Sequence, residues 1–150
     1  MLPIRILSEP DRAETVALIV GAFGEDHRTM IEDDFALIGS SDPYRPTFFG
    51  AVDGKDLIGT AAAMGIGFTY PDCSSILWIA VRKDRRRQGI GKAMIDHVLN
   101  HIADGIFHGK PGTVLLSAEN RRRAFYEKFG FKAGIPTHAE QVIFGRTLNA

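Results

Sequence analysis

The stretch Arg86–Lys92, which reads Arg-Arg-Gln-Gly-Ile-Gly-Lys, constrains the fold more than any other part of the chain. It joins an apolar run, Ile76 to Val81, to a segment from about Ile90 whose apolar residues recur at helical spacing. Two glycines within three residues allow a tight turn and a close approach of the backbone to a ligand. The helix would offer free N–H groups and a positive dipole end to an anion. The stretch predicts a strand, a phosphate-binding turn and a helix in succession.

The other segments alternate between strand and helix patterns. Strands are expected over residues 3–7, 47–52, 57–64, 75–81, 113–117, 131–133 and 141–147, and helices from a cap at Ser8 to Gly24, over about 29–38, from about 90 to 102, and over about 120–129. The turn Asp53-Gly54-Lys55-Asp56 indicates an antiparallel hairpin. We therefore predict an α/β (α+β) fold for residues 1–150, with a mixed, mostly antiparallel seven-stranded sheet flanked by about four helices.

Composition limits the classes of function. The chain has 150 residues and 45% apolar residues, which favours one globular domain without a linker. Lys plus Arg number 18 and Asp plus Glu also number 18, so no overall charge favours nucleic acid or an anionic membrane. Cys73 is the only cysteine, which excludes an internal disulfide, and no Cys/His pattern predicts a metal. With no secretory signal and no membrane-length apolar run, we expect a soluble cytoplasmic protein.

The glycine turn fits two common nucleotide-binding motifs poorly. A Walker loop requires Gly, four residues and Gly-Lys-Ser/Thr, and that string is absent around residues 86–94. A dinucleotide-binding fingerprint would place a third small residue where Met94 stands. The basic run Arg82 to Arg87 could also be a solvated loop or a nucleic-acid patch, although no aromatic residue is interleaved to stack on bases.

Two motifs together carry a family resemblance. Ile79-Ala80-Val81 followed by Arg86-x-x-Gly89-x-Gly91 resembles the acetyl-CoA motif of the GNAT superfamily of N-acetyltransferases. Downstream, the segment from Phe125 to Phe131 is similar to the FYEK-x-GF segment of that family, and the two motifs come in the family's order. The resemblance implies an acetyl-CoA-dependent N-acetyltransferase that moves an acetyl group directly to a primary amine, without a metal.

The resemblance also implies residue roles. The coenzyme A site would comprise Ile79, Ala80, Val81, Arg86, Arg87, Gln88, Gly89, Ile90, Gly91, Lys92 and Asn120. Tyr126 matches the general acid that protonates the departing thiolate, although a half-buried helix tyrosine would have the same pattern. Asn120 lies six residues before Tyr126 where seven is usual, so Asn120 could instead serve as a helix N-cap.

A general base is not evident. Many relatives carry a Glu on the fourth strand, whereas Ile76 to Ile79 holds no carboxylate. The candidates elsewhere are Glu25, Asp26, His27, Glu32, Asp33, Asp34, Glu119 and His138, and proton loss to water is a further possibility.

In this family the acceptor is bound by segments that correspond to residues 24–46 and 134–140, which include Arg28, Tyr44 and Arg45. We favour a small-molecule amine over a peptide or protein amine, and homodimers are common in the family. The alternatives are a non-catalytic acyl-CoA-binding or sensing module and, third, a nucleic-acid-binding protein that uses the arginine clusters.

Overall fold

The computed structural model describes residues 2–42, 45–65, 73–105, 112–136 and 141–148. Its strands are β1 (Ile4–Ile6), β2 (Thr47–Asp53), β3 (Asp56–Gly65), β4 (Cys73–Val81), β5 (Gly112–Glu119), β6 (Lys132–Pro136) and β7 (Gln141–Leu148). Its α-helices are α1 (Arg12–Phe23), α2 (Arg28–Ala36), α3 (Ile90–Gly105) and α4 (Arg123–Glu127). The expected order of elements and the mixed seven-stranded sheet are confirmed.

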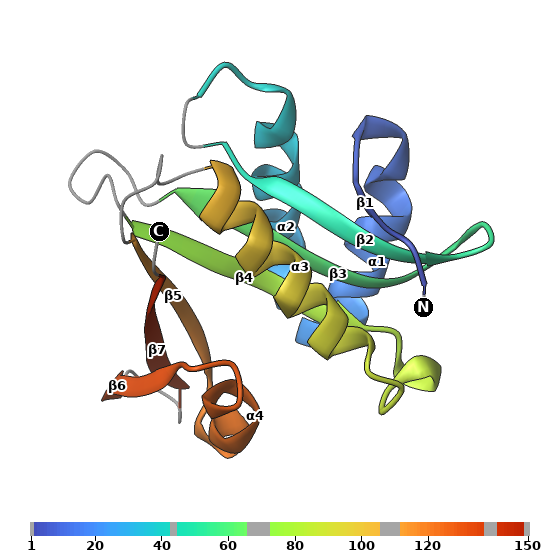
Figure 1. Ribbon diagram of the computed structural model, residues 1–150. Coiled ribbons are helices and arrows are strands. Elements are labelled where there is room, and N and C mark those ends of the chain that lie inside the picture. Colours follow the sequence, from blue (N-terminus) through green and yellow to red (C-terminus); the bar gives the residue numbers. More distant parts are fainter. Residues whose placement is uncertain (1, 43–44, 66–72, 106–111, 137–140, 149–150) are drawn as a thin grey trace.

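The strand order across the sheet is β1-β2-β3-β4-β5-β7-β6 (Figure 1). Every neighbouring pair is antiparallel except β4 and β5, which are parallel. The predicted hairpin joins β2 to β3, where Asp53 lies opposite Asp56 and Gly54 adopts a φ of 62°. A positive φ suits glycine because it has no Cβ, which explains why this turn could be predicted.

Helices cover both faces of the sheet. Helices α1 and α2 lie on one face, and α3 crosses the other (Figure 1). Phe35 and Phe48 belong to the core on the α1/α2 side, whereas Met94, Val98 and Phe144 belong to the core on the α3 side, and all five are fully buried. Each large apolar side chain buried in this way stabilises the fold by about 1.5–3 kcal/mol, which anchors the helices at fixed positions on the sheet.

The N-terminal turn leads directly into α1. A 3₁₀ turn over Glu9–Asp11 precedes the helix, and the backbone N–H of Ser8 donates to the Asp11 carboxylate at 2.8 Å. Arg5 on β1 donates to both oxygens of the same carboxylate, at 2.9 and 2.8 Å. The helix ends at Gly24, whose φ is 106°, as the sequence predicts.

Helix α4 is shorter than the expected helix over residues 120–129. The segment begins as a 3₁₀ turn over Asn120–Arg122, and only the following five residues are α-helical. Gly130, at a φ of 84°, closes the helix: its N–H donates to Glu127 O, and the N–H of Phe131 donates to Tyr126 O. This pair of bonds satisfies the last helical carbonyls, so the helix ends where its glycine reverses the chain.

Membrane-spanning helices and metal clusters are both absent from the described residues. No helix among the described residues is long and apolar enough to cross a membrane. Within those same ranges, no group of three or more His, Cys, Asp or Glu side chains could hold a metal ion. Residues 106–111 of the predicted connection between α3 and β5 lie outside the described residues.

Candidate functional site

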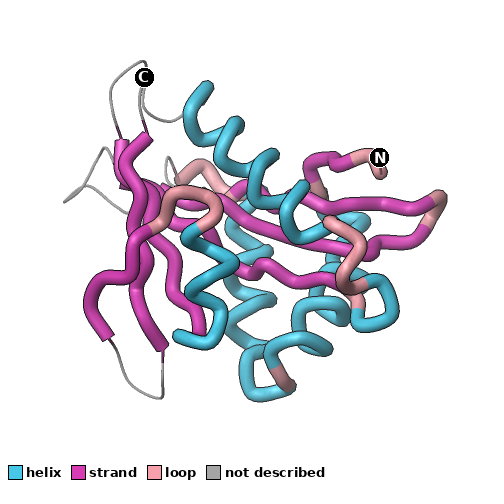
Figure 2. The backbone as a smooth tube through the Cα atoms, turned by 60° about the horizontal axis from the view of Figure 1, so that its bottom comes forward, coloured by secondary structure: helices cyan, strands magenta, loops and turns pink. Residues whose placement is uncertain are grey.

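The two parallel strands at the centre of the sheet part soon after they pair. Strand β4 pairs with β5 from Cys73, opposite Thr113, to Ser75, opposite Leu115, and the register ends there. Beyond Ser75, the β5-facing edge of β4 has no neighbouring strand among the described residues. Figure 2 shows the two parts of the sheet running in different directions. Strand β4 therefore has an open edge inside the molecule, where backbone groups can bind a ligand.

The register indicates which backbone groups face this open edge. The N–H of Arg82 donates to Ile58 O at 2.8 Å, which makes these two residues a hydrogen-bonded pair of the antiparallel ladder. Because such pairs alternate along a ladder, the backbone N–H of Ala80 is directed toward β3. The N–H groups of Ile79 and Val81 are directed toward the open edge. Of the three predicted strand residues, these two therefore have backbone N–H groups at the open edge.

A bulge interrupts β4 next to this edge. Trp78 adopts a φ of 51°, and the pairing with β3 shifts register between Thr60 and Ala62. As a result, Leu77 and Trp78 both pack on the α1/α2 side of the sheet, although successive strand residues ordinarily alternate. The hydroxyl of Thr60 donates to the displaced carbonyl oxygen of Trp78 at 3.0 Å. The bulge thus changes the direction of the backbone of β4 immediately before Ile79.

The glycine turn leaves its backbone donors free. Among the described residues, none of the N–H groups of residues 86–92 makes a backbone hydrogen bond of ordinary geometry, and Ala93 is the first to bond, to Gly89 O at 3.0 Å. Arg87 and Gly89 have φ values of 61° and 78°, so the chain turns twice through the left-handed region before α3 begins. Successive free N–H groups at a helix start form an anion-binding site. We call residues 86–92 the cradle.

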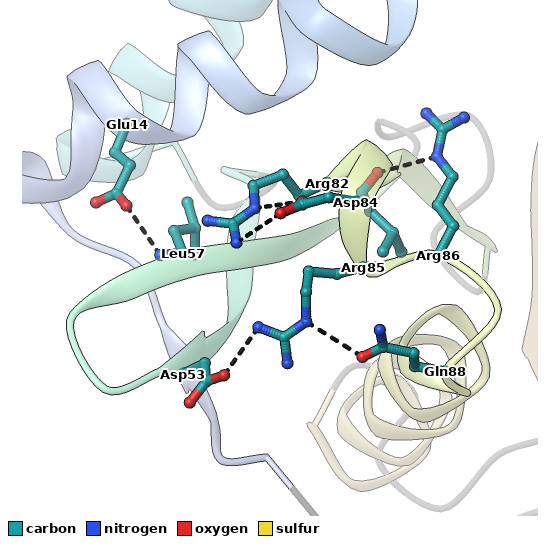
Figure 3. Close-up of polar contacts among 9 residues, drawn as sticks. Glu14, Asp53, Leu57, Arg82, Asp84, Arg85, Arg86 and Gln88 are labelled. Atoms are coloured by element: carbon teal, nitrogen blue, oxygen red, sulfur yellow. Dashed lines mark hydrogen bonds and ion pairs between the residues drawn. The ribbon is translucent and has the colours of Figure 1, made fainter.

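Few of the cations around the cradle are free. Arg82 pairs with Asp84 at 2.7 Å and Arg85 with Asp53 at 2.8 Å (Figure 3). Lys92 pairs with Asp96 at 2.8 Å. Within the described ranges, Arg86 and Arg87 have no carboxylate partner, and both are exposed. Within the cradle itself, the positive charge available to an anion therefore comes mainly from these two arginines.

Gly91 connects the cradle with the open edge and with α4. A Cβ placed on Gly91 would lie 3.8 Å from Phe125 Cζ and 3.8 Å from Val81 Cγ2. The first turn of α3, the last residue of β4 and helix α4 therefore meet at one point. The structure brings the two sequence motifs together in space, as a shared binding site requires.

Tyr126 lies in the core beside this meeting point. Only 6% of its surface is exposed, and its ring contacts Phe125, Phe131 and Phe144, with centroids 5.1, 6.2 and 5.4 Å away. Burial raises the pKa of the Tyr126 hydroxyl above its usual value, against a smaller opposing effect of Arg122. No described residue is hydrogen-bonded to this hydroxyl. Tyr126 therefore keeps its proton at neutral pH and has it available for donation.

Asn120 does not cap a helix as the sequence allowed. It is the first residue of the 3₁₀ turn, is exposed, and its Oδ1 accepts a hydrogen bond from Arg123 Nε at 3.1 Å. Glu119 precedes the turn, and Arg122 occupies the cap position of α4. The N-cap interpretation is therefore wrong, because the α-helix starts later than expected.

The candidate bases have different surroundings. Glu25 and Glu32 both pair with Arg28, and Glu119 pairs with Arg121; the arginines hold the pKa values of Glu25 and Glu119 below the usual range. No described residue pairs with Asp26 or Asp33. His138 and Tyr44 lie outside the described residues. Pairing with a cation makes a carboxylate a weaker base, so Glu25 and Glu119 are poor choices.

Among the candidates that the structure describes, Asp34 and His27 contact Trp78 of β4. The carboxylate of Asp34 accepts a hydrogen bond from Trp78 Nε1 at 2.9 Å. The His27 ring packs 6.3 Å from Trp78, and its Nδ1 is buried with no hydrogen-bond partner in the described part of the chain. The exposed ring of Phe23 completes this aromatic group, 5.3 Å from Trp78. Sequence reasoning missed both the group and the bulge, because the apolar run Ile76–Ile79 shows neither.

One cavity lies elsewhere. Its volume is about 370 Å³, and its lining consists of Thr113, Gly130, Lys132, Gly145, Arg146 and Thr147. This lining includes no residue of the cradle or of the open edge of β4, so the cavity does not belong to the site described above.

Solved structures share this fold. An acetyltransferase of the GNAT family from Staphylococcus aureus Mu50 is 16% identical with a TM-score of 0.78, over 99% of this chain and 100% of that one. The PaiA N-acetyltransferase from Thermoplasma acidophilum, in complex with coenzyme A, is 18% identical with a TM-score of 0.73 and 99% of both chains covered. The ribosomal-protein-S18-alanine N-acetyltransferase from Escherichia coli is 19% identical with a TM-score of 0.75, over 100% of this chain and 96% of that one.

A protein-family model adds evidence at the level of sequence. No curated protein matches the chain. The model described as the acetyltransferase (GNAT) domain matches residues 45–133, which span more than half of the chain and include the cradle and α4. Together with the parted strands β4 and β5, this match establishes that the chain belongs to the GNAT acetyltransferase family.

Proposed function

We propose that this protein transfers an acetyl group from acetyl-CoA to a primary amine. The observation that carries the proposal is the open edge of β4 lying directly beside the cradle of free N–H groups. Coenzyme A has an elongated pantetheine arm with amide groups and an anionic pyrophosphate. An open strand edge followed at once by an anion site matches that sequence of groups. The residues present therefore fit this donor substrate.

Different groups of the chain would bind different parts of coenzyme A. The free N–H groups of the cradle would donate to the pyrophosphate, and Arg86 and Arg87 would add charge. Ile79 and Val81 would pair with the pantetheine amides as a neighbouring strand does. Each charge-assisted hydrogen bond of this kind contributes about 1.5–3 kcal/mol, so several together give useful affinity.

Transfer then needs polarisation of the thioester and a proton for the thiolate. A backbone N–H on the open edge after the bulge would stabilise the oxyanion while the amine nitrogen bonds to the carbonyl carbon. As the C–S bond breaks, Tyr126 would donate its proton to the departing sulfur. The proton that the acceptor nitrogen loses would pass to water or to a nearby base. Tyr126 suits this role because burial keeps its hydroxyl protonated.

We propose a small-molecule amine as the acceptor. The α1–α2 region that lies over the bulge combines the exposed ring of Phe23 with Asp26 and Asp33, two acids without a described partner. Aromatic and acidic groups together favour an ammonium ion over an anion. A protein amine is the second possibility, since the Escherichia coli neighbour acts on ribosomal protein S18. A cytoplasmic location and a homodimer stay predictions.

The test is turnover of acetyl-CoA, followed as free thiol release, against a panel of small amines and peptides. Coenzyme A binding is measured in parallel by calorimetry and by thermal stabilisation. We expect both binding and turnover with at least one amine. Absence of coenzyme A binding would contradict the proposal. Thermal stabilisation of the protein by coenzyme A without turnover on any amine would favour an acyl-CoA-binding module. DNA binding that coenzyme A cannot displace would favour the nucleic-acid alternative.

A further inference from the structure

A hydrogen bond connects helix α2 to the bulge of β4. The indole Nε1 of Trp78 donates to Asp34 Oδ2 at 2.9 Å, and the two residues lie 44 positions apart in the sequence. The bond is partly buried, so water competes with it less than at the surface. Trp78 is the only tryptophan of the chain. Asp34 is therefore the side chain through which α2 contacts the irregular point of the strand.

The backbone of Trp78 needs such support. Its φ of 51° is rare and strained for a residue with a bulky side chain. Strain of this kind persists only where surrounding contacts hold it. Thr60 bonds the carbonyl oxygen of Trp78, whereas Asp34 holds the far end of its side chain. Phe23 and His27 pack against the indole ring but supply no directional bond.

The position of the bulge decides where the next backbone donor points. Ile79 follows Trp78 directly, and its N–H is directed toward the open edge where β4 and β5 part. A rotation at Trp78 would move that N–H away from a thioester carbonyl. Misplacement by about 1 Å can slow a reaction roughly a hundredfold. Fixing the position of the Trp78 indole therefore also fixes the direction of the Ile79 N–H.

We infer that Asp34 is a positioning residue, which acts through Trp78 to keep the β4 bulge in the geometry that polarises the acyl group. The inference rests on the proposed acetyl transfer. It differs from the role of a general base, for which Asp34 was one candidate. A base must accept a proton, whereas a positioning residue needs only an oxygen that accepts the indole N–H.

The Asp34→Asn variant separates the two roles, because its amide oxygen can still accept from Trp78 but cannot take a proton. We would measure kcat and the KM for acetyl-CoA of Asp34→Ala, Asp34→Asn and Trp78→Phe, with the best amine of the panel. Asp104→Ala is the control, since Asp104 is an exposed acid on α3, which lies on the opposite face of the sheet from α2. Thermal melting of each variant reports whether it is folded.

For Asp34→Ala and Trp78→Phe we expect kcat to fall by about tenfold to a hundredfold while the KM stays within about threefold. Asp34→Asn should stay within about threefold of the wild type, and Asp104→Ala should be unchanged. The double variant Asp34→Ala/Trp78→Phe should be no slower than the slower single variant, because both changes break the same bond.

Two kinetic outcomes would overturn the inference in favour of another role. If Asp34→Asn is as slow as Asp34→Ala, Asp34 acts as a base. If the losses of the double variant multiply, Asp34 and Trp78 act independently. An Asp34→Ala variant as fast as an active wild type would show that the bond has no part in catalysis.

If the wild type turns over no amine, the proposed acetyl transfer fails, and the positioning of Trp78 is tested by its fluorescence instead. The emission maximum and acrylamide quenching of Trp78 should change in Asp34→Ala and stay like the wild type in Asp34→Asn. Unchanged emission and quenching in folded Asp34→Ala would show that Asp34 does not hold the indole.

Discussion

The Nε of Arg86 donates a hydrogen bond to the carbonyl oxygen of Val81 at 3.2 Å (Figure 3). The first side chain of the cradle thus lies against the last residue of β4. This contact places a guanidinium that has no carboxylate partner among the described residues between the anion site and the open edge. It also distinguishes Arg86 from Arg85, which is bound to Asp53 and Gln88.

We predict that Arg86→Ala weakens coenzyme A binding about tenfold or more, because one charge-assisted hydrogen bond contributes about 1.5–3 kcal/mol. The change in kcat should be smaller, since Arg86 is far from the reacting carbonyl in the proposed mode of binding. Calorimetry on Arg86→Ala and on the control Arg85→Ala measures this difference. Equal losses in the two variants would contradict a specific role for Arg86.

Substitutions of the two glycines of the cradle should have different effects. Gly89 has a φ of 78°, so Gly89→Ala should lose about 1–2 kcal/mol of unfolding free energy. Gly91→Ala should be as stable as the wild type, because its Cβ meets Phe125 and Val81 at an ordinary 3.8 Å. Gly91→Trp should lose coenzyme A binding, since the indole would fill the space beside these residues. Urea unfolding and calorimetry test both points, and a destabilised Gly91→Ala would count against this geometry.

Replacing Tyr126 by Phe should lower kcat and leave the affinity for coenzyme A nearly intact. The variant keeps the buried ring, and the hydroxyl has no hydrogen bond to a described residue, so the stability should change by less than about 1 kcal/mol. Because burial raises the pKa of Tyr126, the wild-type proton donor should stay active to a pH above about 10. Steady-state kinetics over the alkaline range checks this. An unchanged kcat would defeat the assignment.

The pair Arg5–Asp11 should make stability depend on pH at the acid end. Its hydrogen bonds lower the pKa of Asp11 from 3.8 to about 2. The folded pKa is below the unfolded one, so the stabilisation is complete above pH ~4 and is lost as the pH falls toward ~2. Since the Arg5 side chain is half exposed, we expect about 0.5–1 kcal/mol. Acid titration of unfolding free energy should show this difference between the wild type and Asp11→Ala disappearing near pH 2; a difference that persists there would contradict the assignment.

Local patterns in the sequence were sufficient for most of the elements. Gly54 indicated the hairpin and Gly24 the end of α1, because a backbone at positive φ favours glycine wherever the turn occurs. The strand before the cradle was predicted from an apolar run, and the helix after it from the helical spacing of its apolar residues. Both patterns are local properties of the sequence. The α-helix predicted to start at Asn120 starts instead at Arg123, after a 3₁₀ turn. Over so few residues, a 3₁₀ turn and an α-helical turn have similar residue spacing, so the sequence pattern does not distinguish them.

The sequence by itself determined the family, through two motifs, and it predicted an anion site at residues 86–92, where glycines and a helix start suit an anion. Only the tertiary structure decided which groups stay free to bind it. The ion pair between Arg85 and Asp53, the parting of β4 from β5, and the bond between Asp34 and Trp78 all involve residues that are far apart in the sequence. Such contacts depend on how helices and strands pack in space, and no short stretch of sequence contains that information.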